Sequence, residues 1–254
     1  MLNNILFTLR GETSQFKFGF KVRPDDTFIV SYPKSGNTWI RFILANLLQP
    51  DEIINFRNID GIVPDVHKSI NHLKDITSPR IMKIHKHDFD YFQKTIYIVR
   101  DGRDTLVSYY HYNMDLNIFH GTFSQFLRSS LPTRFGTWSE HVHTAMKFNY
   151  EHPERMLYLR YEDMLIDLPS NIEKIASFCG ITINSGLIER VTKACTFDSL
   201  KKNEQTYGSE ILNKDIQFFR KGTSRQWQDY FTPEDMDLFL ESSRGMLLAN
   251  NYQI

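Results

Sequence analysis

The feature that most constrains the fold is a series of short apolar segments separated by longer segments of helical character. Each short segment has the length of a strand and is apolar along nearly its whole length, with many β-branched or aromatic residues. These segments span Thr27–Tyr32, Ile81–His85, Thr95–Arg100 and Met156–Tyr161. Strands that are buried on both faces have this composition. The sequence therefore predicts an α/β fold in a single domain, residues 1–254, with a central parallel sheet flanked by helices.

The intervening segments carry helix signals. Helices are predicted over Thr38–Leu48, Arg103–Leu116, Gly136–Tyr150 and Asn171–Cys179. Ser170 and Glu173 have the spacing of a capping box, which predicts Ser170 as the N-cap of the last of these helices. Thr232 directly before Pro233 predicts the start of a further helix.

Composition excludes several classes of protein. Lys plus Arg and Asp plus Glu both number 30, so the formal net charge is +0, whereas a general nucleic-acid binder needs a basic excess. No segment approaches the roughly 18 apolar residues that cross a bilayer. The only cysteines are Cys179 and Cys195, which favours a reducing compartment over a disulfide scaffold. We therefore expect a cytoplasmic protein with no nucleic-acid partner and no membrane partner.

A candidate anion site follows the first predicted strand. Residues 32–39 join this strand to the next helix, at the carboxyl edge of the sheet where open α/β proteins bind ligands. Backbone N–H groups at a helix N-terminus bind anions, and Lys34 adds a positive charge. Ser35 and Thr38 add hydroxyl groups, and Gly36 gives the turn conformational freedom. The loop is P-loop-like, but Lys34 precedes its glycine and the order G-x-x-x-x-G-K-[ST] is absent.

Four segments of the chain, in order and approximate spacing, resemble the motifs of the cytosolic-type sulfotransferases. Residues 32–39 resemble the 5′-phosphosulfate loop of that family, and residues 97–111 resemble its 3′-phosphate segment. Phe219-Arg220-Lys221-Gly222 resembles its C-terminal R-K-G loop. Lys83 and His85 stand where the family has a lysine and its catalytic histidine. The resemblance extends from about residue 20 to residue 232.

The resemblance implies a binding site for the sulfuryl donor 3′-phosphoadenosine 5′-phosphosulfate and its product adenosine 3′,5′-bisphosphate, with no metal required. The donor-binding residues that it implies are Lys34, Ser35, Gly36, Asn37, Thr38, Trp39, Arg100, Ser108, Tyr161, Thr196, Phe197, Arg220, Lys221 and Gly222. Arg100 ends a predicted strand, where its planar guanidinium can pair with a phosphate. The aromatic members of this set are expected to clamp the adenine ring. Arg103 and Asp104 are expected to form a salt bridge rather than bind the donor.

The chemistry assigns roles to a few of these residues. Sulfuryl transfer resembles phosphoryl transfer, an in-line displacement in which charge builds on the leaving phosphate oxygen. Lys34 is the candidate cation at that oxygen, and His85 is the candidate general base. Lys83 is expected to contact the sulfate or the acceptor, and Ser108 completes the predicted catalytic set. His87 points to the same face as His85 if the strand continues.

The acceptor is expected to be a small molecule that offers a hydroxyl or an amine. Phe18, Phe20, His87 and Phe119 are candidate residues of its pocket. No metal site is expected, because the His85/His87 and His141/His143 pairs lack a third ligand at a familiar spacing.

Two other functions and the oligomeric state remain open at this stage. The chain is also compatible with a P-loop-type small-molecule or nucleotide kinase, or with a non-catalytic nucleotide-binding protein. A homodimer is possible, although the family's dimer motif is degraded to Gln228, Thr232-Pro233 and Asp237.

Overall fold

The computed structural model describes residues 18–69, 71, 73–210 and 218–254. At its centre is a four-stranded sheet in the order β2-β1-β3-β4. The strands are β1 (Thr27–Val30), β2 (Ile81–Ile84), β3 (Lys94–Val99) and β4 (Met156–Arg160). All three pairings are parallel, which confirms the predicted fold class.

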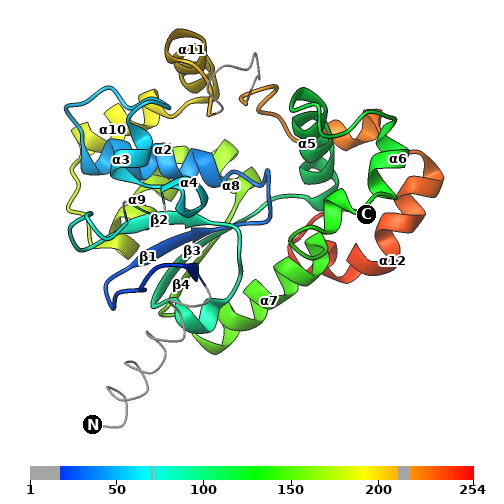
Figure 1. Ribbon diagram of the computed structural model, residues 1–254, viewed down its shortest axis with the longest axis horizontal. Helices are drawn as coiled ribbons and strands as arrows, with labels where there is room; N and C mark the ends of the chain where they lie inside the picture. The colour runs from blue at the N-terminus through cyan, green and yellow to red at the C-terminus, as the bar shows by residue number, and fades with distance from the viewer. Residues whose placement is uncertain (1–17, 70, 72, 211–217) are drawn as a thin grey trace.

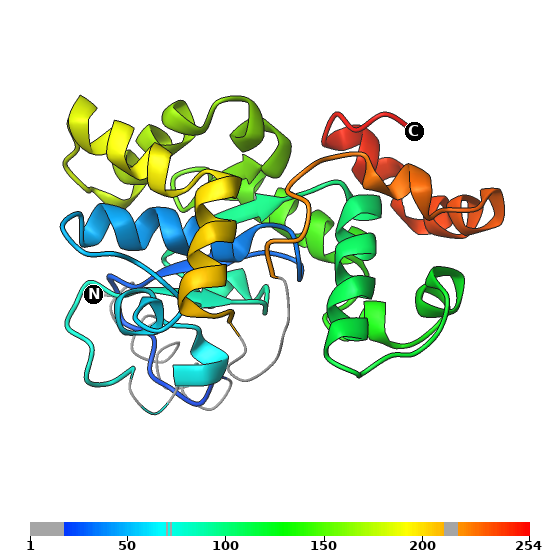
Figure 2. The same cartoon turned by 90° about the horizontal axis from the view of Figure 1, so that it is seen from above.

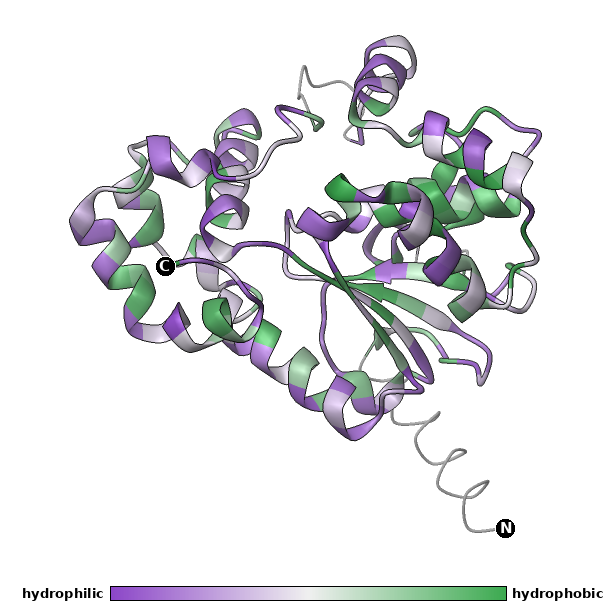
Figure 3. Cartoon of the chain, turned by 180° about the vertical axis from the view of Figure 1, so that it is seen from behind, coloured by the Kyte–Doolittle hydropathy of each residue, from purple (hydrophilic) through white to green (hydrophobic). Residues whose placement is uncertain are grey.

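The sheet is buried on both faces because its residues alternate between two cores. Phe28 and Val30 belong to one core, and Ile29 between them belongs to the other. Hydrophobic residues occupy much of the length of the strands (Figure 3). A strand whose two faces are both covered reads as continuously apolar, which explains why the sequence pattern identified these segments.

Helices cover each face of the sheet (Figure 1). The first group comprises α2 (Asn37–Leu48), α8 (Tyr161–Ile166), α9 (Leu168–Cys179), α10 (Ser185–Ala194) and α11 (Phe197–Tyr207). The second group contributes to the other core. It comprises α7 (Trp138–Glu151), which runs along the sheet, and three helices that lie beyond it in Figure 1, α5 (Gly102–Asp115), α6 (Phe123–Leu127) and α12 (Pro233–Ala249). Short helices α3 (Ile59–Ile62) and α4 (Val66–Ser69) precede β2. Helices α10 and α12 lie at opposite ends of the molecule in both ribbon views (Figures 1 and 2).

Of the two helix starts that capping patterns predict, one is confirmed and the other is wrong. Thr232 caps α12 as predicted, because its hydroxyl accepts a hydrogen bond from the backbone N–H of Asp235 at 3.1 Å. The predicted N-cap at Ser170 is wrong. Helix α9 begins at Leu168, and the carboxylate of Asp167 accepts the backbone N–H of Ser170 at 3.1 Å. An aspartate cap three residues before Ser170 therefore sets the start.

The parallel direction places the ends of all four strands at one edge of the sheet. The residues that follow β1, β2, β3 and β4 are Ser31, His85, Arg100 and Tyr161. Ligand sites of open α/β sheets form at this edge. Among the helices that the structure describes, none combines the length and the apolar character needed to cross a membrane.

Candidate active site

A cavity at the carboxyl edge of the sheet brings together residues from six separate parts of the chain. Most of the residues that the sequence predicts for the donor site line it. They are Lys34, Gly36, Asn37, Thr38, Trp39, Lys83, His85, Arg100, Ser108, Tyr161, Phe197, Arg220, Lys221 and Gly222. The parallel sheet gathers them, because the loops after β1, β2 and β3 all begin at this edge.

The loop between β1 and α2 has the backbone conformation of an anion-binding turn. Lys34 has φ 69° and Gly36 has φ 112°, both left-handed. Such a turn directly before a helix N-terminus presents backbone N–H groups to a ligand. A Cβ atom on Gly36 would lie 2.9 Å from Ile98 Cδ1 and from Tyr161 Cδ2. Glycine is therefore required here both for its φ and for the close packing of the loop on the sheet.

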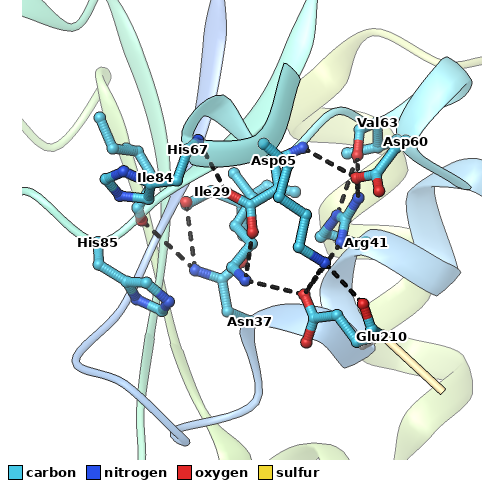
Figure 4. A network of polar contacts seen from close by, with 12 residues as sticks. Ile29, Asn37, Arg41, Asp60, Val63, Asp65, His67, Ile84, His85 and Glu210 are labelled. Carbon is cyan, nitrogen blue, oxygen red and sulfur yellow. Dashed lines mark hydrogen bonds and ion pairs between the residues drawn. The ribbon is translucent and has the colours of Figure 1, made fainter. Parts of the chain in front are cut away.

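Asn37 fastens this loop to two strands. Its side-chain amide lies 3.4 Å from the carbonyl oxygen of Ile29 and 3.5 Å from that of Ile84, in β1 and β2 (Figure 4). Because Ile84 directly precedes His85, the same amide connects the anion loop with the base of the predicted mechanism. The sequence predicts Asn37 as a residue of the donor site, and the structure gives it this bridging contact.

Lys34 is half-buried, and its ammonium lies between two aromatic rings. Its Nζ is 3.7 Å from the ring centroid of Phe218 and 4.3 Å from that of Tyr112. Burial lowers the pKa of Lys34 to about 7, and the nearby carboxylate of Glu210 opposes part of this change. No ion pair to its ammonium occurs among the residues described, so this cation is available to an anionic ligand.

Lys83, in contrast, is held by two carboxylates. Its Nζ donates to Asp65 Oδ2 at 2.8 Å and to Glu210 Oε1 at 3.3 Å, within the buried network of Figure 4. Burial alone would lower the pKa of Lys83, but Glu210 and Asp65 outweigh it and raise the pKa above its usual value. Arg41 on α2 extends the network, with its guanidinium 3.7 Å from Glu210. Lys83 therefore carries a permanent charge at the cavity wall.

His85 is held in one tautomer by the backbone. Its Nδ1 lies 2.9 Å from the carbonyl oxygen of Ser31, which only accepts hydrogen bonds. Nδ1 therefore carries the proton, and Nε2 has a free lone pair. Burial, followed by the charge of Lys83, lowers the pKa of His85 to about 4. The imidazole is therefore neutral at pH 7 and able to accept a proton at Nε2.

The backbone carbonyl group of His85 is also held by a hydrogen bond. The buried His141 on α7 contacts the carbonyl oxygen of His85 through Nε2 at 3.0 Å. The opposite ring nitrogen of His141 lies 2.7 Å from the hydroxyl of Tyr97 on β3. A carbonyl accepts only, so Nε2 donates and Nδ1 accepts from the tyrosine. This chain of hydrogen bonds holds the turn after β2 in place.

Arg100 connects the anion loop with the C-terminal loop. Its guanidinium donates to the carbonyl oxygens of Lys34 at 3.4 Å and Thr223 at 3.1 Å, and it lies 4.5 Å from the ring centroid of Tyr161. Its buried Nε has no hydrogen-bond partner in the described parts of the chain. The nearby Arg220 donates to the amide oxygen of Gln226 at 2.5 Å. Both arginines line the cavity.

Asp104 anchors the C-terminal loop to helix α5. Its carboxylate accepts the backbone N–H groups of Arg225 at 2.7 Å and Trp227 at 3.0 Å. The predicted salt bridge between Arg103 and Asp104 is wrong, because Arg103 pairs with Asp101 at 2.7 Å. Asp101 caps α5 and is two residues away, so the same side chain serves as cap and counter-ion. Asp104 is thereby free to hold the loop.

Three aromatic residues of the predicted adenine clamp lie near one another. The rings of Trp39 and Tyr161 are 5.3 Å apart in an edge-to-face arrangement, and the indole N–H donates to the carbonyl oxygen of Cys195 at 2.8 Å. Phe197 begins α11 and packs closely on Gly222, where a Cβ atom would lie only 2.1 Å from its ring. A flat ligand ring fits such aromatic surroundings.

Two residues of the predicted donor site lie outside the cavity lining. Thr196 is exposed and caps α11, since its hydroxyl accepts the backbone N–H of Ser199 at 3.2 Å. Ser35 is in the anion loop but 1% exposed, and its hydroxyl has no hydrogen-bond partner within the described residues. A buried hydroxyl in this position is an observation consistent with a ligand on the loop.

None of the four residues predicted for the acceptor pocket lines the cavity. Phe18 and Phe20 pack in the core on Phe92 and Phe28. Phe119 packs against aromatic residues of α5 and α6. His87 faces the ring of His141 at 4.5 Å between centroids. The burial of their apolar surface is enough to explain where the three phenylalanines lie, and no ligand is needed for that explanation.

Sequence reasoning missed three cavity residues that surround the lysines. Tyr112, Glu210 and Phe218 all line the cavity. Tyr112 stands four residues after Ser108 on α5, so helical spacing is the signal that identifies it. Glu210 and Phe218 have no local signal, because only the tertiary fold brings their segments to β2 and Lys34.

The protein has an α/β fold with a parallel sheet. At the carboxyl edge of this sheet, a glycine-containing turn and several cations form a site of the kind that binds phosphate-like anions. Residues 24–244 match the model of the Sulfotransferase domain family, and the chain belongs to this family. It is therefore a sulfotransferase, as the sequence motifs predicted. The curated relatives include bovine (Bos taurus) sulfotransferase 1A1, 31% identical over 245 residues and covering 87% of this chain and 82% of the relative. Human (Homo sapiens) sulfotransferase 4A1 is also 31% identical, over 248 residues, with 89% of this chain and 82% of the relative covered.

Comparison with solved structures identifies the same family. The mouse sulfotransferase SULT7A1, in complex with PAP, is 28% identical with a TM-score of 0.73, covering 92% of this chain and 88% of that chain. A retinol dehydratase complex with retinol and PAP has a TM-score of 0.68 at 23% identity, covering 93% of this chain and 84% of that chain. At that identity the second match supports the fold alone.

Proposed function

We propose that the protein transfers a sulfuryl group from 3′-phosphoadenosine 5′-phosphosulfate to a hydroxyl or amine of a small-molecule acceptor. The observation that carries the proposal is one cavity that holds both a turn for an anion and a neutral histidine with a free Nε2. The likeness to the PAP complex of the mouse sulfotransferase supports the identity of the donor.

The residues present fit such a donor. The buried hydroxyl of Ser35 and the buried Nε of Arg100 lack partners within the described residues, and buried polar atoms normally have one. Lys34, Arg100, Arg220 and Lys221 place positive charge on the cavity wall. These groups would hold the phosphates, while Trp39, Tyr161 and Phe197 would hold the base. When bound, the donor supplies the sulfuryl group and leaves as adenosine 3′,5′-bisphosphate.

The two lysines have different tasks in this proposal. Lys34 has no carboxylate partner within the described parts of the chain, so its ammonium is available to stabilise the charge that develops on the leaving phosphate oxygen. Lys83 donates two of its three N–H bonds to Asp65 and Glu210 and has one left for the acceptor or the sulfuryl oxygens. Ser108 lies at the same cavity wall on α5.

His85 acts as the general base. Nε2 accepts the proton of the acceptor hydroxyl or amine as the new bond to sulfur forms and the sulfur–phosphate oxygen bond breaks. The hydrogen bond from Nδ1 to Ser31 keeps the ring in the tautomer that this step needs.

The experiment that tests the proposal compares nucleotides. Thermal unfolding of the purified protein is measured with adenosine 3′,5′-bisphosphate, with ADP, and with ATP plus Mg²⁺. A ligand at about 100 times its Kd adds about 2.7 kcal/mol of stability, which raises Tm by several degrees. A shift with the bisphosphate and not with ADP supports the proposal, and transfer of labelled sulfate to an acceptor panel completes it. A shift with Mg-ATP alone contradicts it.

A further inference from the structure

The ammonium of Lys34 occupies a small site of its own within the cavity. Two ring centroids lie within 4.3 Å of Nζ, those of Phe218 and Tyr112, and the two rings meet at 84° with centroids 6.5 Å apart. Glu210 lines the same cavity, and its carboxylate opposes part of the lowering of the Lys34 pKa. We call Tyr112, Phe218 and Glu210 the ammonium cage. Aromatic faces combined with a carboxylate are the general means by which proteins bind alkylammonium groups.

The cage is built from fixed parts. Glu204 accepts the backbone N–H groups of Phe218 at 2.7 Å and of Phe219 at 3.0 Å, which holds the Phe218 ring over the cavity. Tyr112 projects from α5, a helix of 14 residues. Glu210 is held through its carboxylate by Lys83 at 3.3 Å and by Lys68 at 3.4 Å. The cage therefore does not depend on Lys34 for its shape.

Lys34 has to leave the cage to perform the role proposed for it. The stabilisation of a leaving phosphate requires the ammonium at the anion, not between two rings. Its departure removes one positive charge from the surroundings of Glu210 and exposes two aromatic faces. The same cavity contains His85 and Lys83, so a molecule in the cage can also reach the base.

We infer that the acceptor carries an ammonium group, separated by a short spacer from its hydroxyl, and that this group occupies the cage of Tyr112, Phe218 and Glu210 when Lys34 turns to the donor. The inference rests on the proposed function in one respect, the assignment of Lys34 to the donor. The side chain of Lys34 then serves as a substitute for the acceptor in the free protein. Acceptor binding and the movement of Lys34 favour one another, because both cannot occupy the cage.

The test uses a Lys34→Ala variant, in which the cage is open without any nucleotide. The probes are amino alcohols from ethanolamine to 6-amino-1-hexanol, each compared with the alkanol in which a methyl group replaces the ammonium. Binding is measured by titration calorimetry at about pH 6, where a primary ammonium in surroundings like those of Lys34 keeps its proton. The series of spacers is needed because the acceptor length is unknown.

At least one amino alcohol is expected to bind Lys34→Ala about 3- to 30-fold more tightly than its alkanol. Adding Phe218→Leu or Tyr112→Leu is expected to reduce this ratio toward one. Adding Tyr110→Leu is the matched control, since this residue is on the same helix but packs against Phe119 and Phe126. The ratio is expected to persist in that control.

Equal affinity for each amino alcohol and its alkanol overturns the inference, as does the absence of binding by either series or a preference that survives both leucine variants. Binding of adenosine 3′,5′-bisphosphate to the wild-type protein is measured in parallel. Failure of the bisphosphate to bind contradicts the proposed donor. The preference of Lys34→Ala for an ammonium group is measured without nucleotide, so it is judged separately. The two failures are therefore distinguishable.

Discussion

The Nζ of Lys83 lies 2.8 Å from Oδ2 of Asp65, and the same two residues are also neighbours through a parallel backbone bridge. The backbone pairing extends the edge of the sheet beyond β2 and places the carboxylate beside the lysine. Lys34 lines the same cavity and has no carboxylate partner among the described residues, and the pKa values of the two lysines move in opposite directions. The charge of Lys83 is thereby maintained, whereas the protonation of Lys34 can change when a ligand binds.

The first prediction concerns this ion pair. Asp65→Asn leaves a buried ammonium with one carboxylate fewer, and we expect the free energy of unfolding to fall by about 3–5 kcal/mol. The double variant Asp65→Asn/Lys83→Met removes the uncompensated charge and is expected to recover part of the loss. Urea unfolding measures both. Asp163→Asn, which breaks a pair at a side chain that is 51% exposed, is the control and is expected to cost less than about 1 kcal/mol.

A double variant no more stable than Asp65→Asn alone would contradict this explanation. In that case the loss would come from the hydrogen bond that Asp65 accepts from the backbone of His67 at 3.0 Å, and not from the ion pair.

The second prediction concerns the base. His85→Ala is expected to lower kcat/KM by about 10²–10⁴-fold, the usual contribution of a positioned general base. Affinity for adenosine 3′,5′-bisphosphate is expected to change little, because the imidazole is proposed to contact the acceptor rather than the nucleotide. Labelled-sulfate transfer measures the first quantity and calorimetry the second. His143→Ala, on the same α7 helix that carries His141, is the control for loss of a histidine away from the cavity.

The pH dependence of this base follows from its lowered pKa. The neutral form is the active one, so the rate is expected to fall only as the pH drops toward about 4, the pKa of His85. Between about pH 5 and pH 6.5 the rate is then flat with respect to this group. A rate that falls through pH 6.5, the ordinary pKa of histidine, would show that the imidazole is hydrated rather than buried.

Much of this site is readable from the sequence, because its donor half consists of short contiguous motifs. The turn of Lys34 and Gly36 follows a strand directly, and Arg100 follows another, so local pattern and strand direction together place them at one edge. The cavity wall around Lys34 and Lys83 is different. Glu210 and Phe218 also line the cavity, and no spacing relative to either lysine indicates this.

The errors have physical causes of the same kind. Phe18 and Phe20 are as hydrophobic as any pocket residue, but hydrophobicity alone does not distinguish a core from a pocket wall, and both are 6% exposed in the core. The cap at Ser170 was outcompeted by Asp167, which starts α9 earlier with Pro169 in the first turn. Arg103 pairs with Asp101, while Asp104 accepts a hydrogen bond from the backbone of the C-terminal loop.

The third prediction concerns Lys34 and pH. Its ammonium binds phosphate only when protonated, and burial lowers its pKa to about 7. Affinity for adenosine 3′,5′-bisphosphate is therefore expected to decrease as the pH rises from about 6.5 to 8.5, since the phosphates are largely ionised above pH 6 and contribute little further change. Lys34→Arg keeps its charge throughout this range. We expect calorimetry to show a flat pH dependence in that variant, and a slope equal to that of the wild type would refute the assignment.

The fourth prediction concerns the contact between the C-terminal loop and the adenine clamp. Gly222 has φ 65°, and a Cβ atom there would lie 2.1 Å from the ring of Phe197. Gly222→Ala therefore forces either the loop or the ring away, and both line the cavity proposed to bind the donor. We expect Kd for adenosine 3′,5′-bisphosphate to rise by at least about 10-fold, which corresponds to about 1.4 kcal/mol.

Gly245→Ala in α12 is the matched control, because a Cβ atom there meets nothing within 4 Å, and alanine in a helix is favoured over glycine by about 0.5–1 kcal/mol. The control is expected to bind normally and unfold at a slightly higher temperature. If Gly222→Ala binds the bisphosphate as tightly as the control does, the loop can move without affecting the ligand, and the close packing of Gly222 on Phe197 serves stability alone.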